Sequence, residues 1–205
     1  MSWSPKLIVF VKAPKIGRAK TRLAKDIGAA RAATFYRQAT AKLLGRMADR
    51  RWETLLAVDP APYICDGFTN LWPPNFQRIG QGKGDLGQRM GQQFTHAKPG
   101  PVIIIGSDAP GVTRALIANG FANLRGSDAV FGPAEDGGYW LIGMARRRCA
   151  PNLFHQVRWS TEYTLQDTLT SLPFRFRISH LPKLSDIDDG KDLANMPGAL
   201  LRSHS

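Results

Sequence analysis

The sequence opens with Lys6-Leu-Ile-Val-Phe-Val11, a short apolar run that fixes the class of fold. Its β-branched residues follow no period of 3.6, so the run predicts a strand buried on both faces. Residues 52–58 and 102–105 are apolar runs of the same kind, and segments with helical spacing separate them. Strands that alternate with helices in this way favour an α/β fold with a largely parallel sheet.

The remaining elements follow the same alternation. The first helix, from Gly28 onward, is predicted to bury side chains three or four residues apart, namely Ala32, Phe35, Ala39, Leu43 and Met47. The other expected elements are strands at 76–79, 129–131, 139–144 and 175–181, and helices at 86–96, from about 113, and near 161–172. Neither a repeat nor a linker interrupts the pattern, so we expect residues 1–205 to form one domain.

Composition sets the range of partners. Of the 205 residues, 43% are hydrophobic, which is enough to bury a core and excludes wholesale disorder. The longest apolar runs fall far short of the roughly 18 residues that a membrane span needs, so the sequence predicts a cytoplasmic protein with no membrane span. The net charge of +12 indicates an anionic partner: nucleic acid, anionic lipid or a phosphorylated small molecule.

A cationic loop follows the first strand directly. It holds five Lys or Arg residues between Lys12 and Arg22, together with Gly17, and a helix is expected to follow. Cations and backbone N–H groups at the carboxyl end of a strand converge on one place, which favours phosphate binding over a merely solvated loop. The loop is not a Walker A motif, because its Lys20-Thr21 pair lacks the required glycine spacing.

Carboxylates follow two of the predicted strands. Asp108 ends the apolar run at 102–105, and because Thr113 is the better N-cap for the next helix, Asp108 is a candidate ligand for Mg²⁺ or Mn²⁺. Asp186 and Asp188 follow the last strand on alternate positions, so they would point the same way if that segment is extended. Residues 188–190 could equally begin another helix.

The segment 132–140 combines two acids with glycines and aromatic residues. This mixture suits a polar acceptor or a sugar, with Glu135 or Asp136 as a base and with Tyr139 and Trp140 offering a face to the sugar. A hairpin turn at Asp136-Gly137 is the plainer alternative.

Residues 82–87 match the GxGxxG spacing of dinucleotide sites. The strand before them is too short and too polar for the centre of a parallel sheet. A tight turn into a helix is therefore favoured over a nicotinamide site.

Six segments, in order along the chain, resemble one group of enzymes. They are Lys12-Ala-Pro-x-x-Gly-x-x-Lys20-Thr-Arg-Leu23, Gln81-Gly-x-Gly-Asp-Leu-Gly-x-Arg-Met90, Gly106-Ser-Asp-x-Pro110, Gly132-Pro-Ala-x-Asp-Gly-Gly-Tyr139, Trp159-Ser-Thr161 and Leu184-x-Asp-Ile-Asp188. Together they resemble the small bacterial GT-A-like transferases of the nucleotide-diphospho-sugar transferase superfamily, including glycosyltransferases associated with arsenosugar biosynthesis. The chain is more distantly similar to 2-phospholactate and molybdenum-cofactor guanylyltransferases.

The resemblance implies a three-layer α/β/α sandwich with a mostly parallel mixed sheet, which binds a nucleotide or NDP-sugar. It also implies that Asp108, with Asp186 and Asp188, holds Mg²⁺ or Mn²⁺, although the sequence after Asp188 departs from many relatives and loosens the choice between the two late acids. The implied nucleotide-binding residues are Lys12, Ala13, Gly17, Lys20, Arg22, Gln81, Gly82, Asp85, Ser107, Gly137, Gly138 and Tyr139.

Three functions remain open at this point. The first is metal-dependent transfer of a glycosyl group from an NDP-sugar, with Asp108, Glu135 and Asp136 as the catalytic residues. The second is nucleotidyl transfer, in which a phosphorylated acceptor attacks a nucleoside triphosphate and pyrophosphate leaves. The third is a non-catalytic basic protein that binds nucleic acid or acts as a scaffold. We expect a small-molecule partner rather than nucleic acid, because the cations are scattered instead of lying along one helix.

Overall fold

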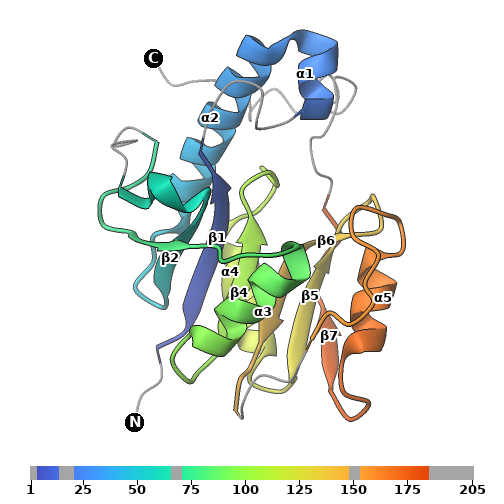
Figure 1. Cartoon of the computed structure of the whole chain (residues 1–205). Helices are drawn as coiled ribbons and strands as arrows, with labels where there is room; N and C mark the ends of the chain where they lie inside the picture. The colour runs from blue at the N-terminus through green and yellow to red at the C-terminus, as the bar shows by residue number, and fades with distance from the viewer. Residues whose placement is uncertain (1–3, 14–20, 66–70, 148–152, 185–205) are drawn as a thin grey trace.

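The computed structural model describes residues 4–13, 21–65, 71–147 and 153–184. Its strands form one seven-stranded sheet in the order β3-β2-β1-β4-β6-β5-β7 (Figure 1). The strands are β1 (Lys6–Lys12), β2 (Glu53–Asp59), β3 (Gln77–Gly80), β4 (Val102–Gly106), β5 (Ala129–Pro133), β6 (Tyr139–Met144) and β7 (Ile178–His180). The helices are α1 (Thr21–Ile27), α2 (Ala29–Met47), α3 (Leu86–His96), α4 (Arg114–Asn123) and α5 (Thr164–Ser171), with a 3₁₀ helix over Ala61–Cys65.

The sheet is parallel around β1 and mixed beyond β4. β1 pairs in parallel with both β2 and β4, and β3 adds to β2 in parallel. β6 runs antiparallel between β4 and β5, and β7 is parallel to β5. In register, Lys12 lies opposite Asp59 and Phe10 lies opposite Gly106. The carboxyl ends of β1, β2 and β4 therefore meet at one edge, where an open α/β sheet binds its ligands.

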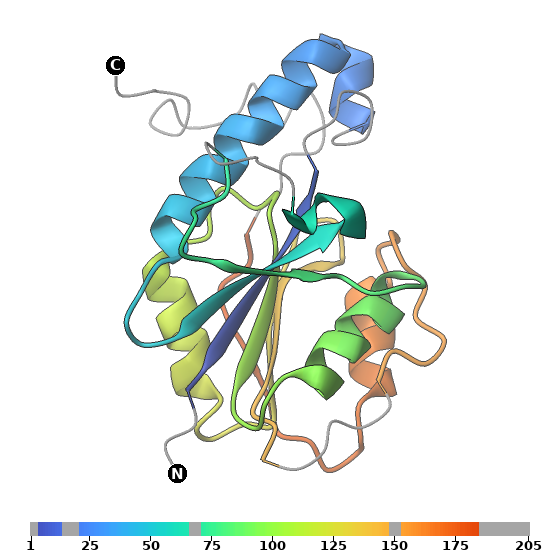
Figure 2. The same ribbon diagram turned by 60° about the vertical axis from the view of Figure 1, so that its left-hand side comes forward.

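Alternate residues of β1 enter two separate cores, because side chains in a strand point to opposite faces. Leu7, Val9 and Val11 pack in the core that contains residues of α2 and α4. Ile8 packs in the other core, which contains residues of α3 and α5. Figure 2 shows the corresponding layers, with α2 and α4 on one face of the sheet and α3 and α5 on the other. This arrangement confirms the expected three-layer sandwich with a mostly parallel mixed sheet.

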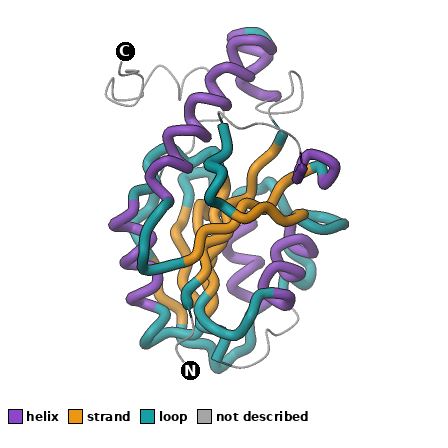
Figure 3. Tube along the Cα trace, turned by 90° about the vertical axis from the view of Figure 1, so that its left-hand side faces the viewer, coloured by secondary structure: helices purple, strands orange, loops and turns teal. Residues whose placement is uncertain are grey.

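The first two helices reach beyond the layers. α1 and the N-terminal half of α2 extend past the carboxyl ends of the strands (Figures 1 and 3). The first residues of α2, 29–31, are correspondingly exposed. No helix in the described part of the chain is long and apolar enough to cross a membrane.

Most predicted elements lie close to their expected positions. α3 and β6 have the predicted bounds, and the Thr113 hydroxyl caps α4 by accepting a hydrogen bond from the N–H of Leu116 at 3.2 Å. β3 lies at an edge of the sheet, as its polar sequence indicated. The last strand is shorter than predicted, because only residues 178–180 pair with β5, and α5 begins at Thr164 instead of 161.

The buried face of α2 differs from the prediction. Phe35 and Ala39 are only half-buried, whereas Tyr36 and Thr40 are buried. The two sets share Ala32, Leu43 and Met47, but in place of 35 and 39 the buried positions are 36 and 40, one residue later than predicted. On this face the Tyr36 hydroxyl reaches the polar backbone at the end of β1, where it finds hydrogen-bonding partners.

Candidate active site

A cleft of about 440 Å³ opens at the edge where the carboxyl ends of β1 and β4 lie. One side of it comes from Lys12, Arg89 on α3 and the segment after β4. The other side comes from the start of β6 and from residues 159–161. The cleft thus joins the parallel half of the sheet to the antiparallel half.

The cleft collects part of the predicted site. Seven of the predicted residues line it: Lys12, Gln81, Ser107, Asp108, Asp136, Gly138 and Tyr139. Five others are described but do not line it: Ala13, Gly82, Asp85, Glu135 and Gly137. Gly17, Lys20, Asp186 and Asp188 lie outside the described residues, as does the side chain of Arg22.

Tyr36 holds the two central strand ends together. Its hydroxyl accepts a hydrogen bond from the backbone N–H of Lys12 at 2.9 Å and lies 3.1 Å from the Lys12 carbonyl oxygen. The same hydroxyl lies 3.1 Å from Oγ of Ser107, directly before Asp108. Burial raises the pKa of the Tyr36 hydroxyl, so it stays neutral. Tyr36 therefore ties the backbone of Lys12 to Ser107, the residue before Asp108.

Gln81 has a similar positioning role on the other side of β1. Its amide nitrogen donates to the carbonyl oxygens of Val11 at 3.1 Å and Ala57 at 3.0 Å, and its amide oxygen accepts from Arg89 at 3.0 Å. The side chain is only 4% exposed, so its polar atoms serve the protein itself. The predicted contact of Gln81 with a nucleotide stays a prediction. Through its amide oxygen, Gln81 holds the guanidinium of Arg89, which lines the cleft.

Arg89 is a cleft residue that we did not predict as a site residue. Its guanidinium lies 3.7 Å from the Asp59 carboxylate and its Nε donates to the Asp85 carbonyl oxygen at 3.3 Å. The clue in the sequence was its place in the segment 81–90. Arg89 and Lys12 are the cations that line the cleft among the described residues.

Asp108 is exposed at the cleft, immediately after the turn that ends β4. Gly106 leaves room for its carboxylate, because a Cβ at position 106 would lie 2.6 Å from Oδ1 of Asp108. Among the described residues, no group of three or more His, Cys, Asp or Glu side chains is placed to hold a metal ion. A metal site at Asp108 would need a further ligand from the substrate or from outside those residues, and it stays a prediction.

The hairpin between β5 and β6 brings one of the two predicted acids to the cleft. Asp136 lines it, and its Oδ1 accepts a hydrogen bond from the N–H of Gly138 at 2.9 Å. Glu135 is exposed and does not line the cleft. The hairpin turn is therefore confirmed, and the role of Asp136 as a base stays a prediction. Gly137 has a φ of +83°, and a Cβ there would overlap the backbone of Glu162.

The aromatic residues at the start of β6 are more enclosed than the sugar-face interpretation requires. Trp140 is 3% exposed and its Nε1 donates to the Pro182 carbonyl oxygen at 3.1 Å. Tyr139 is half-buried against Phe131, and burial raises the pKa of its hydroxyl. Trp140 lines the cleft but offers little surface to a sugar, so the predicted face of Tyr139 and Trp140 stays a prediction. The indole that lines the cleft with more exposure is that of Trp159.

The glycine segment before α3 forms a turn into a helix. Asp85 caps α3 by accepting from the N–H of Gln88 at 2.8 Å, and Gln88 accepts from the Asp85 N–H in return. Gly87 lies under Trp159, because a Cβ at position 87 would overlap Cζ2 of that indole and lie 2.8 Å from Cβ of Phe154. The segments 81–90 and 159–161, far apart in the sequence, thus touch each other.

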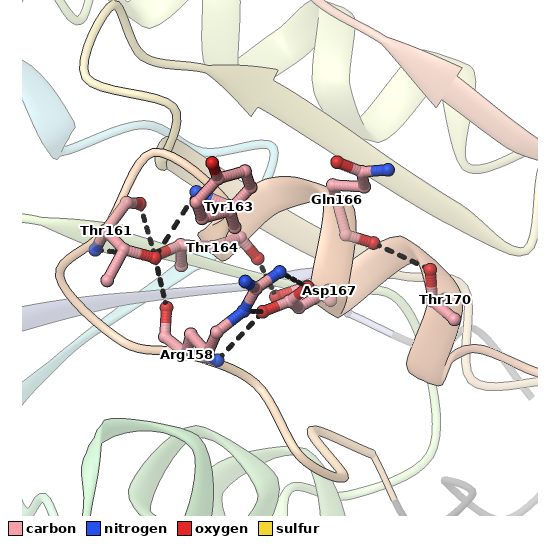
Figure 4. Close-up of polar contacts among 8 residues, drawn as sticks. Arg158, Thr161, Tyr163, Thr164, Gln166, Asp167 and Thr170 are labelled. Atoms are coloured by element: carbon pink, nitrogen blue, oxygen red, sulfur yellow. Dashed lines mark hydrogen bonds and ion pairs between the residues drawn. The ribbon is translucent and has the colours of Figure 1, made fainter.

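The loop that carries Trp159 is anchored to α5 by an ion pair (Figure 4). The Arg158 guanidinium donates to both carboxylate oxygens of Asp167, at 2.8 and 2.9 Å, and the Arg158 backbone N–H donates to Asp167 at 3.0 Å. The guanidinium also lies 4.2 Å from the centre of the Tyr163 ring. These hydrogen bonds lower the pKa of Asp167 to about 2.

This pKa shift predicts a loss of stability in acid that replacement of Asp167 by asparagine should remove. Because the folded pKa is about 2 and that of an unfolded aspartate is about 3.9, the contribution is complete above about pH 5 and disappears as the pH falls toward 2. We expect the wild type to exceed Asp167→Asn in free energy of unfolding by a constant amount from pH 5 to 7, and by a shrinking amount below about pH 4. Urea unfolding across this range measures the difference, and a difference that persists unchanged to pH 2 would contradict the assignment.

Comparison with known proteins identifies the class of this fold. The chain has the fold of the nucleotide-diphospho-sugar transferases. Residues 45–161, more than half of the chain, match the profile of the family described as "Uncharacterized protein conserved in bacteria (DUF2064)". The chain belongs to that family. No curated protein matches the sequence.

Solved structures support the same class. The chain is similar to a proposed nucleotide-diphospho-sugar transferase from Desulfovibrio desulfuricans G20, with 29% identity and a TM-score of 0.86 over 98% of this chain and 95% of that one. It is also similar in fold to the inositol-1-phosphate CTP transferase of T. maritima, with 12% identity and a TM-score of 0.62 over 97% and 95% of the two chains. A third structure with this fold, Rv0371c of Mycobacterium tuberculosis H37Rv in complex with manganese, has 12% identity and a TM-score of 0.52 over 94% and 97%.

Proposed function

We propose that the protein is a metal-dependent transferase that moves a glycosyl group from an NDP-sugar to an acceptor. One observation carries this proposal: Lys12 and Asp108, a cation and a carboxylate, stand at adjacent strand ends in one cleft, where the Tyr36 hydroxyl bonds the Lys12 backbone and lies 3.1 Å from Oγ of Ser107, next to Asp108. The similarity to the proposed sugar transferase from D. desulfuricans over nearly the whole chain supports the same class of donor.

A divalent cation suits the chemistry of the site. Carboxylate and phosphate oxygens are the ligands that Mg²⁺ and Mn²⁺ prefer, and Asp108, with Asp186 or Asp188, would supply the protein's share. A bound ion would neutralise the charge that develops on the leaving nucleoside diphosphate. The manganese in the Rv0371c structure supports an ion of this kind in the same fold.

The protein's own cleft residues would then act on the two substrates. Lys12 and Arg89 hold the diphosphate by charge, which fixes the leaving group before reaction. Asp136 orients the attacking hydroxyl of the acceptor and accepts its proton. Ser107, whose hydroxyl meets Tyr36, keeps the segment before Asp108 in place.

Nucleotidyl transfer is the second candidate, since Lys12 and Arg89 together would also suit a triphosphate. The name of the T. maritima protein describes a reaction of this type on the same fold. In this case an acceptor phosphate would attack the α-phosphate, and pyrophosphate would leave.

A thermal-melting screen of nucleotides and NDP-sugars, with and without Mn²⁺, tests the proposal. We expect a rise in melting temperature that requires both the metal and one nucleotide, since a ligand at 100 times its Kd stabilises by about 2.7 kcal/mol. Radiolabelled sugar transfer from the stabilising NDP-sugar would support glycosyl transfer, and pyrophosphate release from the corresponding triphosphate would support the second candidate. Salt-sensitive duplex binding with no nucleotide effect would contradict both and favour the nucleic-acid-binding alternative.

A further inference from the structure

The two sides of the cleft differ in charge. Lys12 and Arg89 both belong to the side built from the first half of the chain. The opposite wall, from the β5–β6 hairpin and residues 159–164, presents hydroxyl, aromatic and backbone groups with Asp136 as its charged member. All residues of this wall lie in the described part of the chain.

Arg158, a cation beside this wall in the described part of the chain, is paired with a carboxylate. Arg158 precedes Trp159, yet it does not line the cleft, and its guanidinium is taken up by both oxygens of Asp167. Figure 4 shows the Arg158 side chain reaching Asp167 on α5. This cation is therefore paired with a carboxylate rather than presented to a ligand.

Hydrogen bonds within the wall hold its backbone in one conformation. Oγ of Thr164 lies 2.8 Å from the carbonyl oxygens of both Arg158 and Thr161, and the Thr161 hydroxyl donates to the Arg158 carbonyl at 3.0 Å. The N–H of Leu165 donates to the Gly137 carbonyl at 2.9 Å, which ties the wall to the hairpin that carries Asp136. A wall fixed in this way is preorganised for a ligand.

Ser160 is the exception to this internal bonding. It lines the cleft with a φ of +60°, a left-handed conformation that non-glycine residues seldom adopt. In the described part of the chain its hydroxyl makes no hydrogen bond, in contrast to those of Thr161 and Thr164, which follow it. An uncommon conformation at a cleft, held by its surroundings, points to a functional position.

We propose that residues 159–161 bind the second substrate, with Ser160 contacting one of its hydroxyl groups, and that this substrate is an uncharged, hydroxyl-rich molecule such as a sugar or polyol. This inference rests on the proposed glycosyl transfer. A phosphorylated acceptor would meet the Asp136 carboxylate and, among the described residues of this wall, no cation, so its charge would be repelled. A neutral polyol finds hydroxyls to bond and the partly exposed Trp159 ring to pack against.

The proposed transfer exchanges one bond at the anomeric carbon of the sugar for another. An acceptor hydroxyl oxygen forms a bond to the anomeric carbon of the sugar, while the bond from that carbon to the diphosphate oxygen breaks. The bonding pair leaves with the nucleoside diphosphate, and the hydroxyl proton passes to Asp136. Redox chemistry plays no part in this step.

The test uses ¹⁹F NMR of the full chain labelled with 5-fluorotryptophan. The sample contains Mg²⁺, without Mn²⁺, and the nucleoside diphosphate that raises the melting temperature in the screen above. Loss of one signal in Trp159→Phe assigns the Trp159 resonance among the five tryptophans. The probes are matched pairs at equal concentration and ionic strength: glycerol against glycerol 3-phosphate, and glucose against glucose 6-phosphate. We expect the neutral member of at least one pair to shift the Trp159 resonance more strongly than its phosphorylated partner.

Two variants separate the role of Ser160 from a change in loop conformation. Ser160→Gly removes the hydroxyl and suits the left-handed backbone. It should lower the affinity for the neutral probe about three- to tenfold, as expected for one lost hydrogen bond. Gln156→Gly relieves the same kind of conformation, with a φ of +55°, at an exposed residue away from the cleft, and should leave the affinity unchanged.

The outcomes distinguish this inference from the proposed function. Tighter binding of the phosphorylated partners, no response to either member, or an unchanged affinity in Ser160→Gly would overturn the inference even if the nucleotide still raises the melting temperature. Absence of any nucleotide effect on melting would instead overturn the proposed function on which the inference rests.

Discussion

Replacing Gly87 with alanine is expected to lower the free energy of unfolding by about 2 kcal/mol, although alanine is the better helix former. The new Cβ would overlap Cζ2 of Trp159 and lie 2.8 Å from Cβ of Phe154. Both neighbours are packed, with their ring centroids 5.7 Å apart, so neither can move alone. The strain should outweigh the helix-propensity gain of up to about 1 kcal/mol.

Gly91 provides a matched control one turn further along α3. A Cβ at that position would meet only Phe154, at 3.8 Å, which is an ordinary contact. We therefore expect Gly91→Ala to leave stability unchanged or raise it by up to about 1 kcal/mol. Urea unfolding of the two variants measures the contrast. Equal effects of the same sign would show that Trp159 does not occupy the space above Gly87.

The largest effect on activity is expected from Asp108→Asn. If Asp108 is a metal ligand, loss of its charge should reduce transfer by on the order of 100-fold or more and remove the metal-dependent part of the nucleotide melting shift. Asparagine has nearly the same shape, so the protein should still fold, because the Asp108 side chain is exposed. Initial rates and melting curves with and without Mn²⁺ measure the two effects.

Glu53→Gln is the control for this charge change. Glu53 begins β2, at the opposite end of the sheet from the cleft, and its side chain is 45% exposed beside Lys6. Both the rate and the nucleotide shift should stay at the wild-type level in this variant. Full activity in Asp108→Asn would remove Asp108 from the metal site and leave the fold assignment intact.

The fold could be predicted because its signals are local. An apolar run such as 102–105 marks a buried strand by itself, and the polar sequence of 76–79 marks an edge strand. The buried face of α2 could not be predicted in the same way. Tyr36 and Thr40 look like surface residues until the end of β1 supplies polar partners for the Tyr36 hydroxyl, 24 residues away in the sequence.

The candidate site shows the same limit. Lys12, Asp108 and Asp136 were predicted as cleft residues because each follows or joins a strand, and the ends of strands meet at one edge. Arg89 was not, since its direction depends on the amide of Gln81, which itself depends on two carbonyl oxygens of other strands. The place of Trp159 in the cleft likewise depends on packing between α3 and a loop more than 70 positions later.

The antiparallel strand β6 has a consequence for how this architecture can diversify. Because β5 turns back directly into β6, the segment 134–138 reaches the ligand edge without a crossover helix. If Asp136 serves the acceptor as proposed, residues added to this bend would alter the choice of acceptor while the pairing of the parallel half is left untouched. Under that proposal, chimeras that exchange this bend between family members would change the acceptor and keep the nucleotide.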